Sequence, residues 1–207
     1  MSLSSPFLIA LAAVVSYFIG GLPFGYWFVR LASGRDIRTV GSGNIGATNV
    51  HRTQGAKAGV VVLLLDILKG FLAVWLSAWI TGGSPLAIAL AAVLVTGGHC
   101  YPVLLRFKGG KAVACFIGAF LYIAPVALAA VLLIFILIVA IRPYISLGSI
   151  VAAAVFPFLF EVIYRPPTVL LIASVFCSLL IIYRHKGNIQ RLRAGKEATF
   201  SLKGGRA

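Results

Sequence analysis

Residues 112–141 read AVACFIGAFLYIAPVALAAVLLIFILIVAI, an apolar run of 30 residues without a charged side chain. As a single helix the run would be about 45 Å long, because an α-helix rises 1.5 Å per residue. A hydrocarbon core is only about 30 Å thick, and Pro125 inside the run cannot continue the backbone hydrogen-bond ladder. The run therefore predicts two short membrane helices that are divided near Pro125.

The rest of the chain has the same apolar character. Hydrophobic residues make up 61% of the 207 residues and the mean hydropathy is +1.06, which excludes a soluble domain. We expect an all-α polytopic membrane protein in which residues 1–207 form one integral membrane domain with a basic tail at about 184–207. The other apolar segments are 7–29, 58–80, 84–105, 144–160 and 166–183.

The basic residues predict the orientation of these segments. The net charge is +14, but the bases lie at the ends of apolar spans, which argues for a lipid bilayer and against nucleic acid as the partner. Two connections, 81–85 and 161–167, carry only Arg165, which Glu161 balances, so the positive-inside rule puts both outside. With the split at Pro125, parity gives seven transmembrane helices, the N-terminus out and the C-terminus in.

The segment GSGNIGATNVHR (41–52) predicts a phosphate-binding loop. It matches GxGxxG, but an apolar span follows it instead of a soluble βαβ unit, so a dinucleotide site is excluded. Glycine backbones and polar side chains in such a loop can hold an oxyanion, although a flexible loop without a ligand fits the same residues. The candidate residues are Gly41, Ser42, Gly43, Asn44, Asn49 and Arg52.

The segment GGHCYPVLLRFKGGK (97–111) predicts a second phosphate site, since free N–H groups at a helix start lie beside two lysines. Ala112 follows Lys111, so the segment is not a Walker A loop. Lysines at a membrane boundary can also serve only as orientation signals. The candidate residues here are Gly97, Gly98, His99, Lys108 and Lys111.

Two pairs of polar residues could complete the site at the same face of the membrane. His185 and Asn188 are three residues apart, so a continuing helix would put both on one face. Ser146 and Ser149 have the same spacing at the start of another apolar segment. The histidine could equally be an ordinary interfacial group, and the serines could pack helices.

Asp66 and Lys69 lie inside an apolar span, where isolated charges are costly and partners are expected. Their spacing permits a mutual ion pair. The sequence leaves two readings open, a structural pair and a role in proton transfer.

Acidic residues are scarce, which limits the possible chemistry. The whole chain has four, Asp36, Asp66, Glu161 and Glu197, so a site with several carboxylates around Mg²⁺ cannot form. The HxxxD base of common glycerolipid acyltransferases is also missing. We therefore expect a protein that handles phosphates with no metal and no cofactor.

Four segments in order, 41–52, 97–111, YISLGS (144–149) and YRHKGNIQRL (183–192), resemble the signatures of the bacterial PlsY family. These are membrane acyl-phosphate:glycerol-3-phosphate acyltransferases. The resemblance implies transfer of a fatty acyl group from acyl phosphate to the 1-hydroxyl of sn-glycerol 3-phosphate, giving lysophosphatidic acid in the first acylation step of phospholipid synthesis. In that family a glycine is frequent where Ala112 stands.

The resemblance also implies roles for the candidate residues. Ser42, Gly43 and Asn44 would cradle the acyl-phosphate head, whereas Arg52, Lys111, His185 and Asn188 would hold glycerol 3-phosphate. Gly97, Gly98 and Ser149 would complete the pocket. The site would lie on the cytosolic face of the bacterial inner membrane, with the acyl-phosphate-producing enzyme as a possible partner. A transporter or channel for phosphate-bearing solutes is the alternative, although basic groups at one face provide no alternating-access path.

Overall fold

The long apolar run is divided where proline interrupts it, as the sequence predicts. In this computed structural model, which describes residues 5–200, α6 (Val113–Ile123) ends one residue before Pro125 begins α7 (Pro125–Ile141). The other helices are α1 (Pro6–Gly20), α2 (Phe24–Ser33), α3 (Ala47–Gln54), α4 (Ala56–Ile80), α5 (Pro85–Cys100), α8 (Ile145–Tyr164), α9 (Thr168–Arg184) and α10 (Lys186–Arg193), with 3-10 turns η1 (Ile37–Thr39) and η2 (Val103–Leu105). The expected all-α class is confirmed. Residues 201–207 of the predicted basic tail lie outside the described part.

Several segments are long and apolar enough to cross a membrane. Four qualify by length and composition: Pro6–Ser33, Ala56–Ile80, Pro85–Leu105 and Ile145–Tyr164. The pair α9 and α10, bent by 54°, would be a fifth, and α6 and α7 are shorter apolar helices. The count of seven crossings and the outward N-terminus stay predictions.

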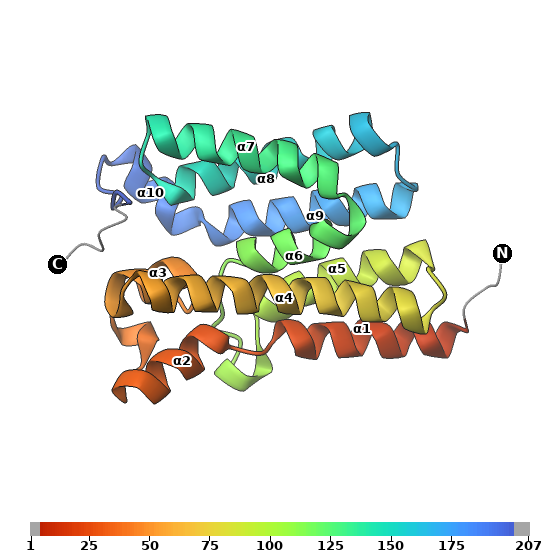
Figure 1. Cartoon of the computed structure of the whole chain (residues 1–207), viewed down its shortest axis with the longest axis horizontal. Coiled ribbons are helices and arrows are strands. Elements are labelled where there is room, and N and C mark those ends of the chain that lie inside the picture. Colours follow the sequence, from red (N-terminus) through yellow and green to blue (C-terminus); the bar gives the residue numbers. More distant parts are fainter. Residues whose placement is uncertain (1–4, 201–207) are drawn as a thin grey trace.

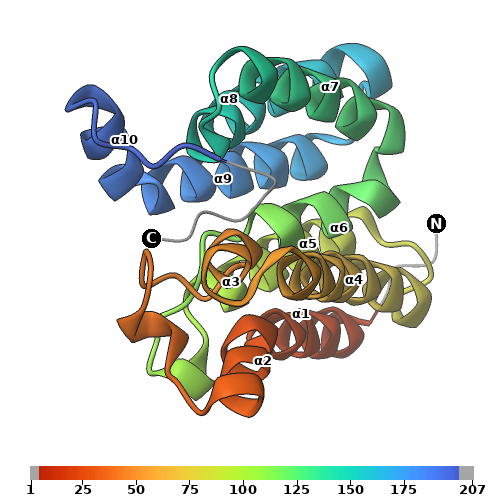
Figure 2. The ribbon, with the colours of Figure 1, turned by 60° about the vertical axis from the view of Figure 1, so that its left-hand side comes forward.

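The helices form two layers with α6 between them (Figure 1). One layer holds α7, α8 and α9, and the other holds α1, α4 and α5. Contacts of α6 with α4 and of α5 with α9 join the layers. The short helices α2, α3 and α10 lie at the end of the bundle away from the start of α1, which brings three distant parts of the chain together there (Figure 2).

Aromatic side chains fill the space between α6 and α8. Phe116 and Phe120 of α6 meet Phe156 of α8, with ring centroids 4.9 and 4.6 Å from that of Phe156. Phe160 continues the cluster one turn farther along α8, and the four rings are almost fully buried. Edge-on and tilted packing of this kind adds to the stabilisation from burial alone. The cluster packs the second half of α8 against α6.

Two glycines let α4 and α6 cross with their backbones in contact. A Cβ at Gly118 would overlap the carbonyl of Ile67, and one at Gly70 would overlap the carbonyl of Cys115. Small residues at helix crossings permit this close approach in membranes, where van der Waals packing holds helices together. Because α6 leads directly from the loop that carries Lys111, this crossing also fixes one side of that loop.

We expect Gly118→Ala to destabilise the fold. Overpacking costs about 1–3 kcal/mol, which lowers the midpoint of thermal unfolding by roughly 2–10 °C in a chain of this size. The matched control is Gly97→Ala, since no neighbouring atom lies within 4 Å of the place that the alanine methyl would take in that helix. Thermal unfolding in detergent should leave the control at or above the wild-type midpoint. Equal midpoints for the two variants would contradict the crossing contact.

Candidate active site

Asn49 organises the glycine-rich loop from inside. This residue of α3 is 1% exposed. Its side-chain Oδ1 accepts the backbone N–H of Ser42 at 2.8 Å. The two N–H groups of its Nδ2 are shared among three backbone carbonyls, those of Ile37, Val40 and Asn44. The amide of Asn49 is therefore fully used in holding the loop, and its role is to shape the loop.

Besides that of Ser42, two backbone N–H groups of this loop are committed within it. Gly43 donates to a carbonyl three residues earlier, and Gly46 donates to the side-chain oxygen of Asn44 at 2.8 Å. Gly41 and Gly43 have positive φ angles of 58° and 68°, which glycine adopts without steric cost. We expected backbone amides to form the oxyanion cradle. We also expected Ser42 and Asn44 to take part, and these two residues of the loop line a cavity.

Hydrogen bonds hold the loop between α5 and α6 from two sides. The N–H groups of Gly109 and Gly110 donate to the carbonyls of Cys100 and His99, at 3.2 and 3.0 Å. The guanidinium of Arg184, at the end of α9, donates to the carbonyls of Gly109 and Gly110 at 2.9 and 3.0 Å. The next residue is Lys111, so these bonds fix where its side chain starts.

A chain of hydrogen bonds runs from Lys111 to a carboxylate. Lys111 Nζ donates to Asn188 Oδ1 at 2.5 Å, and Asn188 Nδ2 donates to Glu197 Oε1 at 2.6 Å. Ser146 Oγ also donates to Oε1, and Arg191 Nε donates to Oε2, each at 2.7 Å. Glu197 thereby orients Asn188 so that its amide oxygen faces the lysine.

The charges around Lys111 favour an anion. Burial lowers the pKa of Lys111 to about 8, Glu197 opposes this shift, and the charges of Arg191, Arg52 and Arg184 add to it. Partial burial raises the pKa of Glu197, but its hydrogen bonds outweigh this and hold it below the usual value. Three arginines thus lie close enough to Lys111 to lower its pKa, and the one carboxylate that opposes them already has its partners. A phosphate would relieve their mutual repulsion.

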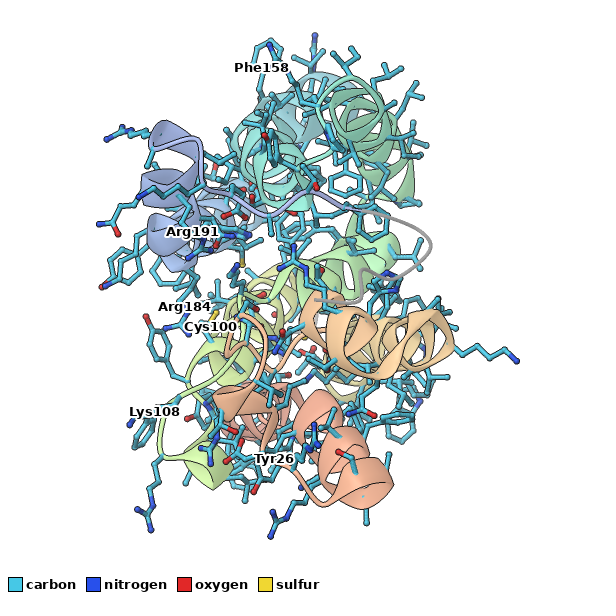
Figure 3. The ribbon with its side chains drawn as sticks, turned by 90° about the vertical axis from the view of Figure 1, so that its left-hand side faces the viewer. Tyr26, Cys100, Lys108, Phe158, Arg184 and Arg191 are labelled. Atoms are coloured by element: carbon cyan, nitrogen blue, oxygen red, sulfur yellow. The ribbon has the colours of Figure 1, made fainter. Side chains whose placement is uncertain are left out.

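A cavity of about 340 Å³ lies among these groups. Four predicted residues line it, namely Ser42, Asn44, Lys111 and Asn188. Figure 3 looks onto this end of the bundle and labels Arg184 and Arg191, which also line the cavity. The remaining lining residues are Tyr101, Tyr183, Lys186 and Gly187.

Arg52 and His185 lie near this cavity without lining it. Arg52 of α3 donates to the carbonyl of Ala198 at 3.5 Å, so the end of the described chain passes beside it. His185 lies at the bend between α9 and α10 and is 3% exposed. Its Nδ1 is 2.8 Å from the carbonyl of Ile181. A carbonyl only accepts, so Nδ1 carries the proton and Nε2 is left for a ligand.

Three residues of the second motif lie away from the cavity. Gly98 packs against the backbone of Tyr17 in α1, where a Cβ would overlap a carbonyl. His99 is buried beside Lys69. Lys108 is exposed on the loop, apart from Arg184 and Arg191 (Figure 3).

Gly97 and Ser149 also have positions outside the cavity lining. Gly97 has open space beside its Cα. The Ser149 hydroxyl donates to the carbonyl of Ile145 at 2.8 Å, within α8. Ser146, by contrast, reaches the site through Glu197.

Sequence reasoning missed Arg184, Arg191 and Glu197. Arg184 is part of the motif YRHKGN, but in the sequence it looked like one of several basic residues at the membrane boundary. Glu197 had a detectable signal, because it is the one acid in a tail with seven bases. Its partners could not be named from the sequence, since Ser146 lies about 50 residues away in the chain.

One cluster of potential metal ligands occurs among residues 5–200, formed by Asp66, His99 and Cys115. The ammonium of Lys69 lies 2.8 Å from Asp66 Oδ1 and 3.1 Å from His99 Nδ1. A metal ion would have to lie beside both ligand atoms, and the Lys69 ammonium already occupies that position. The cluster does not fit a metal ion.

Comparisons with known proteins point to one family. A family model described as glycerol-3-phosphate acyltransferase matches residues 10–195. A protein of Syntrophomonas wolfei named glycerol-3-phosphate acyltransferase is 41% identical over 190 residues, 92% of this chain and 96% of that protein. The glycerol 3-phosphate form of PlsY, an integral membrane glycerol 3-phosphate acyltransferase, aligns with a TM-score of 0.88 and 36% identity over 93% of this chain and 96% of that one. The lysophosphatidic acid form aligns with a TM-score of 0.85 and 33% identity over 95% and 97%.

Proposed function

The chain belongs to the glycerol-3-phosphate acyltransferase family that includes PlsY, and we propose that it takes its acyl group from an acyl phosphate. The acceptor is the 1-hydroxyl of sn-glycerol 3-phosphate, and the products are lysophosphatidic acid and phosphate. The forms of PlsY with glycerol 3-phosphate and with lysophosphatidic acid support the acceptor and the product. The identity of the donor rests on the chemistry of this chain's own residues.

The observation that carries the proposal is the charge around the cavity. Two substrates with phosphate groups need cations, and Lys111 has Arg52, Arg184 and Arg191 around it. Charge-assisted hydrogen bonds from such groups to phosphate are about twice as strong as neutral ones. A thioester carrier would present a neutral reacting group and leave this concentration of charge without a purpose at the reacting end.

We assign the substrate-binding roles from the resemblance to the family and from the place of each residue in or beside the cavity. Ser42 and Asn44 lie on one wall and hold the acyl-phosphate head with their side chains. Arg52, Lys111, His185 and Asn188 hold glycerol 3-phosphate. The other predicted residues act indirectly. Gly41, Gly43 and Asn49 shape the first loop, Ser146 supports Asn188 through Glu197, and Gly97, Gly98, Lys108 and Ser149 lie farther out.

The reaction needs little from the protein beyond positioning and charge. The hydroxyl oxygen attacks the carbonyl carbon, the bond from that carbon to the phosphate oxygen breaks, and the departing phosphate takes the hydroxyl proton. An acyl phosphate is already an activated anhydride, so orientation and electrostatic stabilisation account for the rate. Glu197 is a poor general base, because it accepts hydrogen bonds from Ser146, Asn188 and Arg191.

The position of the cavity in the bundle agrees with a reaction between a lipid-soluble acyl chain and charged phosphate groups. The cavity lies at the end of the bundle where α2, α3 and α10 gather, and the apolar helices extend away from it (Figure 1). The acyl chain can then stay in the bilayer while the charged groups react at its edge. From the distribution of bases, we propose that this end faces the cytosol at the bacterial inner membrane.

The donor is tested with purified protein in detergent and glycerol 3-phosphate. Lysophosphatidic acid should form from acyl phosphate and fail to form from acyl-CoA or acyl carrier protein, and a chelator should leave the rate unchanged. Lys57→Ala, at an exposed position on α4, should keep the wild-type rate and serves as the control for loss of a base. Equal turnover with acyl-CoA would overturn the proposal.

The lowered pKa of Lys111 predicts a pH dependence of acceptor binding. The ammonium begins to lose its charge near pH 8 instead of near 10.5, so the KM for glycerol 3-phosphate should rise above pH 8. The rise should approach about tenfold per pH unit, as for loss of one required proton. Lys111→Arg should have a flat profile from pH 7 to 10, because a guanidinium stays protonated. Parallel profiles for the two proteins would contradict the role of Lys111.

A further inference from the structure

A buried lysine outside the cavity makes three polar contacts. Lys69 of α4 is 3% exposed, and its Nζ pairs with Asp66 Oδ1 at 2.8 Å. It donates to the carbonyl of Leu22 at 2.7 Å and lies 3.1 Å from His99 Nδ1. The carbonyl and the imidazole accept hydrogen bonds from the ammonium, and the carboxylate balances its charge where water is excluded. The contacts join α4, α5 and the break between α1 and α2.

The contact with Lys69 determines which nitrogen of His99 carries the proton. An ammonium can only donate, so Nδ1 accepts and the ring proton lies on Nε2. The ring is thereby held in one orientation by the charged pair behind it. Holding a histidine through one nitrogen fixes what the other nitrogen faces.

The far side of the His99 ring lies against the loop that carries Lys111. A Cβ at Gly110 would overlap the ring, with Nε2 as its nearest atom. The N–H of Gly110 also donates to the backbone carbonyl of His99 at 3.0 Å. On its other side, the same loop is held by Arg184. The loop therefore lies between an imidazole ring and a guanidinium.

We propose that Asp66, Lys69 and His99 form a positioning network that sets where Lys111 enters the cavity. Asp66 and Lys69 orient the ring, the ring supports Gly110, and Gly110 precedes Lys111. The three residues touch no substrate. This inference rests on the proposed function in one respect, which is that Lys111 holds the phosphate of glycerol 3-phosphate. It answers the question that the Asp66 and Lys69 spacing left open in the sequence, and it assigns the pair to structure that serves the site.

The contact between ring and loop is tested by a double-mutant cycle. In His99→Asn the side-chain oxygen takes the place of Nδ1 beside Lys69, but the side chain no longer reaches Gly110. In Gly110→Ala the added methyl meets the ring. Each single variant should weaken the equilibrium binding of glycerol 3-phosphate about tenfold, as expected for loss of one well-placed charged contact. In the double variant the methyl has room, so Gly110→Ala should add no further loss to His99→Asn.

Effects that multiply in the double variant would overturn the proposal, because residues that do not interact give additive free energies. The binding measurement needs no acyl donor, so the cycle gives its answer whichever donor the enzyme uses. If the wild-type protein failed to turn over acyl phosphate while the coupling persisted, the donor assignment would fail and the network would stand. If the wild-type protein turned over acyl phosphate but the two substitutions showed no coupling, the network would fail and the donor assignment would stand.

The part of the network behind the ring is tested by Asp66→Asn combined with Lys69→Met. Replacing both members of a buried ion pair by neutral side chains of similar size often preserves stability. We expect a folded protein in which the KM for glycerol 3-phosphate rises several-fold while kcat changes less, because the ring has lost its donor. A wild-type KM in the folded variant would reduce Asp66 and Lys69 to a structural pair and overturn their place in the network.

Discussion

In a bilayer, a charge or a backbone carbonyl that leaves a helix has to find its partner inside the protein, because no water is available. This constraint acts at the break between α1 and α2, where the carbonyl of Leu22 receives the ammonium of Lys69. It acts again at the loop after α5, whose carbonyls receive Arg184. In both places a side-chain cation donates its hydrogen bonds to backbone carbonyls. These bonds leave Lys111 and Arg52 as the cations that we assign to a substrate.

The site follows from bringing three distant segments to one end of the bundle. Asn49 closes the first loop, Arg184 holds the second, and Glu197 turns Asn188 toward Lys111. Each support is a hydrogen bond between segments far apart in the chain or across a tight loop, so the cavity is formed before any ligand enters. Preorganised charge of this kind lowers the barrier of a reaction whose donor is already activated.

Much of this could be predicted from the sequence. The apolar run with Pro125 gave the all-α membrane class and the division into two helices, because proline and bilayer thickness act locally. The glycine motifs identified Ser42, Asn44, Lys111 and Asn188 as neighbours, and the four line one cavity. The hydrogen bonds of Asn49 within the loop and the contact of His99 with Lys69 could not be predicted, since in the sequence both residues look like ligands in a motif. What separates a support from a ligand is burial and a partner from another helix, which one sequence does not display.

The central claim is that Lys111 and Arg52 form a cation site for the phosphate of glycerol 3-phosphate. It is tested most directly by the equilibrium affinity of glycerol 3-phosphate for Lys111→Ala and Arg52→Ala beside the exposed control Lys57→Ala. Loss of a charge-assisted contact, about 1.5–3 kcal/mol, predicts an affinity roughly tenfold to over a hundredfold weaker in the two site variants and an unchanged affinity in the control. Equal losses in all three folded proteins would contradict the claim, since general attraction to the basic surface would then explain the binding.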